Sequence, residues 1–182
     1  RVHGVVSLAG IPDLIAGLQR NICRGACHEV VGGLPDAMPQ RYQHASPHAL
    51  LPLGVPQWHL VGTEDQLVPA AYLTPYVEVA THHDEVHLEI LPDAGHFELI
   101  VPTTAVWAAV RHAVLALVKR TQGNTKGQTR MSQSLPHGRD GEAILVSVPV
   151  PCADKGLELT AYSVRSCVAP ASGSSSGLAL GA

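Results

Sequence analysis

The chain has 182 residues, of which 46% are apolar and 15% are charged, and its formal net charge is −3. This length suits one packed domain, and so apolar a composition argues against a fully disordered chain. The most apolar helix-like stretch, 105–118, is interrupted by Arg111 and His112, so no run reaches the roughly 18 residues of a membrane span. The slightly acidic balance gives no reason to expect a nucleic-acid partner.

The charge is divided unevenly along the chain. Residues 1–118 contain five arginines, no lysine and eleven acids, a net charge of −6, whereas residues 119–182 carry +3. Two such compositions predict two segments under different constraints. Because the chain opens at Arg1 without a signal-like segment, we expect it to begin inside a longer protein, and we predict no localisation.

The cysteines and clustered histidines predict neither a disulfide framework nor a metal site. Four cysteines are too few for a stapled scaffold, and no second Cys or His pair follows Cys23-x-x-x-Cys27-His28 at finger-like spacing. The run from His82 to His87 lacks the His-Glu-x-x-His order that a zinc protease places on one helix. We therefore expect buried thiols, solvated turn histidines, and no metal or organic cofactor.

Hydrophobic patterning predicts three strands in the first segment. Short apolar runs at 4–8 and 57–61 are typical of buried strands, and the alternating run at 85–91 has the period of two of a half-buried strand. Between the first two runs, the stretch 11–56 holds six prolines and predicts loops and short helices.

Two longer helices are expected beside these strands. Thr74 followed by Pro75 is typical of a helix N-terminus and predicts a helix to about His83. Thr103 is the predicted N-cap of an amphipathic helix that runs to about Val118, with an apolar face formed by Val106, Val110, Ala113, Val114 and Leu117. Alternating strands and helices indicate an α/β fold with a parallel sheet.

Two loops of this sheet are the candidate site, because loops after the carboxyl ends of parallel strands meet at one edge. The loop after the second strand carries Asp65, and the loop after the third carries His96, 31 residues later. Glu64 also lies in the first loop. An acid beside a histidine is the orienting half of a Ser-His-Asp triad.

The residues around this pair resemble the α/β-hydrolase superfamily, in its esterase/lipase branch of feruloyl-esterase-like and kynurenine-formamidase-like enzymes. The matching pieces are Ala45-Ser-Pro-His-Ala-Leu-Leu-Pro-Leu-Gly-Val-Pro56, Gly62-Thr-Glu-Asp65 with Val68-Pro69, Ala94-Gly-His96-Phe97 and Pro102. The resemblance implies that Asp65 is the triad acid, in place of Glu64, and that His96 is the general base. It also implies a carboxylic ester or related acyl substrate and no cofactor. Val61 stands where the family often has histidine.

The nucleophile that this resemblance implies is not expected in the chain. In the family, a Gly-x-Ser-x-Gly elbow and an oxyanion loop precede the acid. Ser7 lacks the leading glycine and sits inside a predicted strand, and Ser175, in Gly173-Ser-Ser-Ser-Gly177, lies in a Ser/Gly-rich tail after the histidine. We therefore interpret 1–118 as the C-terminal half of an α/β-hydrolase domain, with about three strands of its sheet.

Residues 119–182 are expected to form a low-complexity or disordered tail, in which 143–150 and 157–164 are candidate strands of a hairpin. Two alternatives stay open beside the esterase. In the first alternative, the chain is a non-catalytic fragment or partner-dependent half, and its first strand is expected to present an unpaired, aggregation-prone edge. In the second alternative, the chain belongs to a serine peptidase of the prolyl-oligopeptidase kind. The oligomeric state is not predicted.

Overall fold

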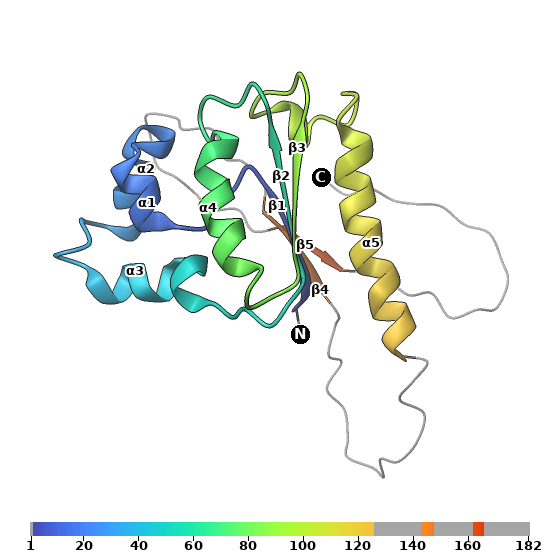
Figure 1. The fold of residues 1–182 in the computed structure, drawn as a ribbon, viewed down its shortest axis with the longest axis horizontal. Coiled ribbons are helices and arrows are strands. Elements are labelled where there is room, and N and C mark those ends of the chain that lie inside the picture. The colour runs from blue at the N-terminus through green and yellow to red at the C-terminus, as the bar shows by residue number, and fades with distance from the viewer. Residues whose placement is uncertain (1, 126–142, 148–161, 166–182) are drawn as a thin grey trace, which may run out of the picture.

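A computed structural model describes residues 2–125, 143–147 and 162–165, and the side chains of 2–120 (Figure 1). In chain order its elements, with short 3₁₀ helices labelled η, are β1 (Val2–Leu8), α1 (Leu14–Gln19), η1 (Ile22–Gly25), α2 (Ala26–Val31), α3 (Pro39–Ala45), η2 (Pro47–Leu50), β2 (Gln57–Gly62), α4 (Ala70–Ala80), β3 (Val86–Leu91), η3 (Glu98–Ile100), α5 (Trp107–Thr125), β4 (Ala143–Ser147) and β5 (Tyr162–Arg165).

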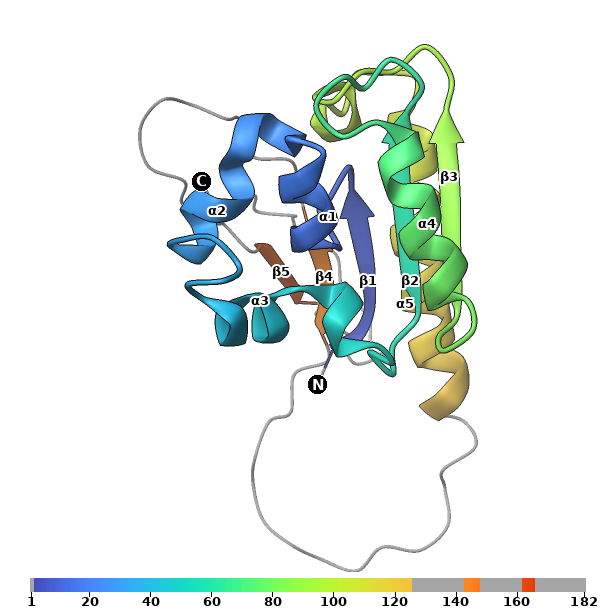
Figure 2. The same cartoon turned by 60° about the vertical axis from the view of Figure 1, so that its left-hand side comes forward.

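The strands form one sheet in the order β3-β2-β1-β4-β5 (Figure 2). The three predicted strands β1, β2 and β3 are parallel neighbours with flanking helices, which confirms the predicted α/β fold. The helices that connect parallel strands cover the sheet faces. The stretch between β1 and β2 consists of short helices and loops, also as predicted, and Asp13 caps α1 by accepting hydrogen bonds from the backbone N–H groups of Ile15 and Ala16.

Helices lie on both faces of the sheet, with α5 on one side and α1 to α4 on the other (Figure 1). The side chains of successive residues in β2 point to opposite faces of the sheet, as they do in any strand. The Trp58 ring contacts His112 of α5, while the next residue, His59, contacts the ring of Tyr76 on α4. The buried core lies in these two layers and includes Val6, Leu8, Leu60, Val61, Leu73, Val110, Ala113 and Leu117.

The predicted start of α4 is wrong, because Pro75 lies inside the helix rather than at its first position. A proline in a helix interior has no N–H for the carbonyl four residues earlier, which is that of Ala71. The guanidinium of Arg20 donates a hydrogen bond to this carbonyl at 3.1 Å. The helix therefore continues through Pro75, because the bond from Arg20 replaces the one that the Ala71 carbonyl cannot receive from Pro75.

The predicted cap of α5 is also wrong, since the helix begins at Trp107 rather than after Thr103. Residues before it form a turn in which the Thr104 hydroxyl donates to the carbonyls of Glu98 and Val101. These bonds hold the segment against η3 and delay the helix. Its predicted apolar face is confirmed: Val110, Ala113 and Leu117 are buried, and Val106 and Val114 are partly buried against the core.

The open edge expected on β1 is not observed. β4 pairs with β1 in parallel, from Val2 opposite Ala143 to Ser7 opposite Ser147, so its backbone takes up the hydrogen-bonding groups that would otherwise be exposed. β5 pairs antiparallel with β4, so the two candidate strands of the second segment do form an antiparallel pair. Residues 119–125, which the sequence predicted to belong to the tail, continue α5, and the rest of the predicted tail lies outside the described residues.

A buried polar network joins β2 to α4. The Gln57 side-chain carbonyl accepts hydrogen bonds from Tyr76 Oη at 2.7 Å and from His59 Nε2 at 3.2 Å. Nε2 therefore carries the proton, and His59 Nδ1, left as an acceptor, has no partner among the described residues. Burial lowers the pKa of His59 to about 4. The ring is therefore neutral in the folded protein at neutral pH.

This buried histidine predicts acid sensitivity. In the unfolded chain His59 titrates near its ordinary pKa of 6.5, so between pH 6.5 and 4 the unfolded state binds more protons than the folded state. The contribution of neutral His59 to the free energy of unfolding is fully present above pH 6.5, and this free energy falls by about 3 kcal/mol as the pH drops to 4. Urea unfolding of His59→Phe should show a correspondingly flatter pH dependence. The exposed control His82→Gln should keep the parental slope, and an unchanged slope in His59→Phe would contradict the assignment.

Candidate active site

The acid loop follows β2 and is folded around the side chain of Asp65. Oδ1 of Asp65 accepts hydrogen bonds from the backbone N–H of Leu67 at 2.9 Å and of Val68 at 2.8 Å. Such a local turn, in which an aspartate accepts from the backbone two and three residues on, is typical of aspartate in loops. It fixes the carboxylate and leaves its second oxygen, Oδ2, for another partner.

The histidine loop follows β3 and is joined to the acid loop by three hydrogen bonds. The backbone N–H of Thr63 donates to the carbonyl of Leu91, and that of Glu64 donates to the carbonyl of Ala94, both at 2.9 Å. The Thr63 hydroxyl accepts from the N–H of Asp93, which has a left-handed φ of 54°. Two backbone-to-backbone bonds and one through the Thr63 side chain thus set the distance between the two loops.

Gly62 is the residue that permits this approach. A β-carbon at position 62 would lie 1.9 Å from the carbonyl oxygen of Ala94 and 2.5 Å from its carbonyl carbon. No side chain fits at that separation, so only glycine allows the loops to lie this close.

His96 and Asp65 meet where these loops converge. His96 Nδ1 lies 2.8 Å from Asp65 Oδ2, and the two side chains are 5% and 0% exposed. Since an ionised carboxylate only accepts, Nδ1 donates the proton. In the neutral ring, Nε2 is then an acceptor with a free lone pair, the form that a general base needs. The ring of Phe97 packs edge-on against His96, with centroids 5.0 Å apart.

The structure brings together the two residues that the sequence singled out, and places the other candidates elsewhere. Glu64 is exposed and its carboxylate accepts a hydrogen bond from the Thr63 hydroxyl, whereas Asp65 is the acid that bonds to His96. Ser7 is buried inside β1, as expected. Ser175 lies outside the described residues.

The expected cysteine and histidine environments are observed where the structure describes them. Cys23 and Cys27 are buried, and His82 and His83 are exposed in the turn between α4 and β3. Within residues 2–120, no three His, Cys, Asp or Glu side chains converge on a common point where a metal ion would bind. The described helices include none that is both long and apolar enough to cross a bilayer.

Three features of the site were missed from the sequence: the close contact at Gly62, the clamp through Thr63, and the packing of Phe97. Phe97 directly follows His96, and the Gly62-Thr-Glu-Asp65 run begins with the essential glycine. These positions were visible as parts of motifs, but their roles depend on where the second loop lies. That placement is a long-range property, since the bonded residues are about 30 positions apart.

A separate open cleft of about 610 Å³ lies among the short helices between β1 and β2. Its lining comes from the region of α1, α3 and η2 and includes Asp13, Tyr42, Ser46 and His48. Neither Asp65 nor His96 lines it. This cleft is therefore not part of the pair's immediate surroundings.

No protein-family model matches the chain, and no curated protein matches its sequence. Solved structures similar to it include a propionate-bound esterase of the planctomycete Thermogutta terrifontis, with 20% identity, a TM-score of 0.45, and coverage of 64% of this chain and 42% of that one. An esterase of Pyrococcus furiosus has 21% identity and a TM-score of 0.40, with coverage of 65% of this chain and 53% of that one. A puromycin hydrolase has 18% identity and a TM-score of 0.42, with coverage of 52% of this chain and 15% of that one.

The chain thus spans at most about half the length of these hydrolases. With TM-scores below 0.5, the class of the protein rests on its own geometry. That class is an α/β protein with a mostly parallel sheet, in which the loops after the carboxyl ends of β2 and β3 carry a buried, hydrogen-bonded Asp-His pair.

The contact at Gly62 predicts a strong and local effect of a single methyl group. Gly62→Ala should lower the free energy of unfolding by roughly 2–4 kcal/mol, because the clash is with a backbone carbonyl that three inter-loop bonds hold in place. Gly95→Ala is the matched control, since a β-carbon there meets only the flexible end of Glu98 at 2.9 Å. It should cost less than about 1 kcal/mol. Equal unfolding midpoints in urea for the two variants would contradict this account.

Proposed function

We propose that this chain is part of a serine hydrolase of the α/β-hydrolase fold, in its esterase/lipase branch, that cleaves a carboxylic ester or related acyl bond. In this proposal residues 1–118 are the C-terminal half of the catalytic domain. The single observation that carries the proposal is the buried hydrogen bond from His96 Nδ1 to Asp65 Oδ2 at 2.8 Å. This bond fixes the tautomer and orientation that a triad histidine requires.

The two side chains would act as base and orienting acid. A serine hydroxyl attacks the acyl carbon while His96 Nε2 accepts its proton, and the imidazolium then protonates the departing alcohol. Water attacks the acyl-enzyme by the same route and releases the acid and the free serine. Asp65 stays ionised throughout and stabilises the imidazolium. The hydrogen bonds from the N–H groups of Leu67 and Val68 and from His96 hold the buried Asp65 carboxylate in place.

The nucleophilic serine and the oxyanion donors are proposed to come from a segment outside this chain. The sequence offers no Gly-x-Ser-x-Gly elbow before Asp65. The chemistry is complete with serine, histidine, aspartate and water, so the proposal includes no metal or organic cofactor. The 182-residue chain alone is expected to show no turnover and no labelling by a serine-directed fluorophosphonate.

The proposal predicts the effect of substitutions in a longer protein that carries such an elbow upstream of residue 1. Asp65→Asn should lower kcat for a p-nitrophenyl ester by about 10³–10⁴-fold, because the amide favours the wrong tautomer of His96. His96→Ala should lower it at least as far. Glu64→Gln, which changes the neighbouring carboxylate, and His82→Ala, which removes an exposed imidazole, are matched controls that should retain activity.

Ester hydrolysis by Asp65→Asn and His96→Ala at the rate of the parent protein would contradict the proposal. Fluorophosphonate labelling of the 182-residue chain itself would contradict the placement of the nucleophile outside it. Faster cleavage of dipeptide amides than of esters would move the protein from the esterase branch to the peptidases.

A further inference from the structure

The open cleft of about 610 Å³ lies at the opposite end of the sheet from the candidate active site. Figures 1 and 2 both place α3, which contributes to its lining, near the amino end of β1, while the loops after β2 and β3 lie at the other end. The volume of the cleft is within the roughly 300–1,000 Å³ that is typical of small-molecule sites. The cleft is therefore a candidate binding site separate from the Asp-His pair.

Buried hydrogen bonds hold the walls of this cleft in place. Tyr42 is 1% exposed, and its Oη donates to the carbonyl of Gly33 at 3.0 Å. Ser46 is 3% exposed, and its Oγ donates to the carbonyl of Pro12 and accepts from the N–H of Leu14, both at 3.2 Å. Because these polar groups already have partners, they define the shape of the cleft rather than wait for a ligand. A ligand therefore meets a preformed site and loses little free energy to ordering the walls.

Apolar side chains form a further part of the lining. They come from α1, the loop before α3, α3 itself and η2, and are Ile15, Pro35, Pro39 and Ala49. Ile15 is 44% exposed, although its side chain is large and apolar. Proline and alanine side chains have almost no rotamer entropy to lose when a ligand packs against them. An apolar group of a ligand would therefore gain favourable contacts here by covering exposed apolar surface.

Two carboxylates give the cleft its charge. Oδ1 of Asp13 caps α1 by accepting from the N–H groups of Ile15 and Ala16. Its Oδ2 lies 3.6 Å from Nδ1 of His48, which is beyond hydrogen-bond distance, and the side chain is 23% exposed. Asp36 also lines the cleft and is exposed, and the described lining includes no lysine or arginine. Oδ2 of Asp13 is therefore an acceptor that a ligand can reach.

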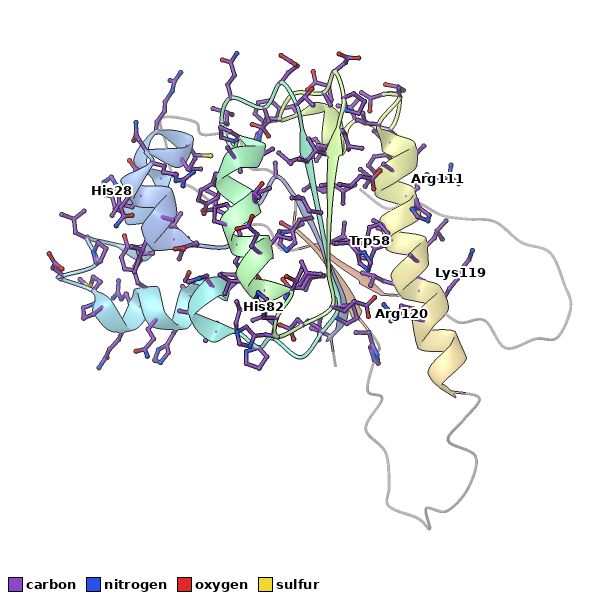
Figure 3. All side chains as sticks on the ribbon, viewed as in Figure 1. His28, Trp58, His82, Arg111, Lys119 and Arg120 are labelled. Carbon is purple, nitrogen blue, oxygen red and sulfur yellow. The ribbon has the colours of Figure 1, made fainter. Side chains whose placement is uncertain are left out.

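Cationic side chains of neighbouring elements do not neutralise these two acids from within the lining. Arg41 belongs to α3 but is not part of the lining, and its guanidinium donates to the carbonyl of Val31 at 3.0 Å. Figure 3 shows Arg111, Lys119 and Arg120 on α5, on the other side of the sheet from α1 to α4. The charge of the cleft therefore favours a cationic ligand.

We propose that this cleft binds a primary ammonium ion that carries an apolar group. The ammonium donates to Oδ2 of Asp13, Asp36 adds to the negative potential, and the apolar group packs against Ile15 and the two prolines. A bare metal ion does not suit the site, because within residues 2–120 no three His, Cys, Asp or Glu side chains converge as ligands. The proposal is independent of the proposed hydrolase activity, since neither Asp65 nor His96 lines the cleft.

Phenethylamine and phenethyl alcohol are matched probes, because they share one apolar group and differ in an ammonium against a hydroxyl. Each is titrated into the ¹⁵N-labelled 182-residue chain at about pH 8, where an alkylammonium is charged and an ordinary imidazole is neutral. We expect the amine to shift the amide signals of Ile15 and Ala49 with a dissociation constant of about 1 mM or lower. The alcohol should bind at least about fivefold more weakly, because it cannot form the charge-assisted bond.

Two variants locate the charge that recognises the amine. Asp13→Asn should remove most of the preference for the amine, while its side-chain carbonyl still caps α1. Glu29→Gln, at an exposed acid of α2 outside the lining, is the control and should keep the preference. Equal binding of the two probes, no shift at Ile15 and Ala49, or an unchanged preference in Asp13→Asn would each overturn the proposal. Shifts confined to the loops of Asp65 and His96 would also overturn it, since the amine would then bind at the candidate active site.

Discussion

The carbonyl of Ala94 occupies the space where residue 62 would carry a side chain, and the architecture of the candidate site depends on that contact. The loops after β2 and β3 come from adjacent parallel strands, yet adjacency alone leaves them separated by side chains. Because Gly62 has none, the backbone of one loop bonds directly to that of the other through Thr63 and Glu64. Peptide groups rather than flexible side chains therefore set the separation of Asp65 and His96.

Burial of the Asp-His pair follows from the same contact, and it decides what the pair is able to do. An ionised carboxylate removed from water is costly unless its oxygens are bonded, and here two backbone N–H groups and one imidazole N–H supply those bonds. A low local dielectric strengthens the bond that remains and limits rotation of the ring. The result is an imidazole with a fixed proton and a free lone pair. His59, by contrast, is buried without a carboxylate and stays neutral at the cost of acid stability.

Patterns in the sequence predicted the fold and the pair because both depend on local periodicity and on one general property of parallel sheets. Apolar runs define β1, β2 and β3, and their carboxyl ends must share an edge, which places Asp65 and His96 together. The start of α4 was beyond such reasoning, since Arg20 supports the carbonyl freed by Pro75 from 51 residues away. Likewise, the pairing of β4 with β1 joins segments more than 130 residues apart, and no local pattern encodes that choice.

The central claim is that Asp65 holds His96 as the Nδ1–H tautomer, with Nε2 free to accept a proton. The most direct measurement is the pair of ¹⁵N chemical shifts of the His96 ring in the labelled chain, at a pH where the ring is neutral. This account predicts a protonated Nδ1 and an unprotonated Nε2, and loss of that preference in Asp65→Asn. A proton on Nε2, or shifts that average between the two tautomers in the parent chain, would contradict it.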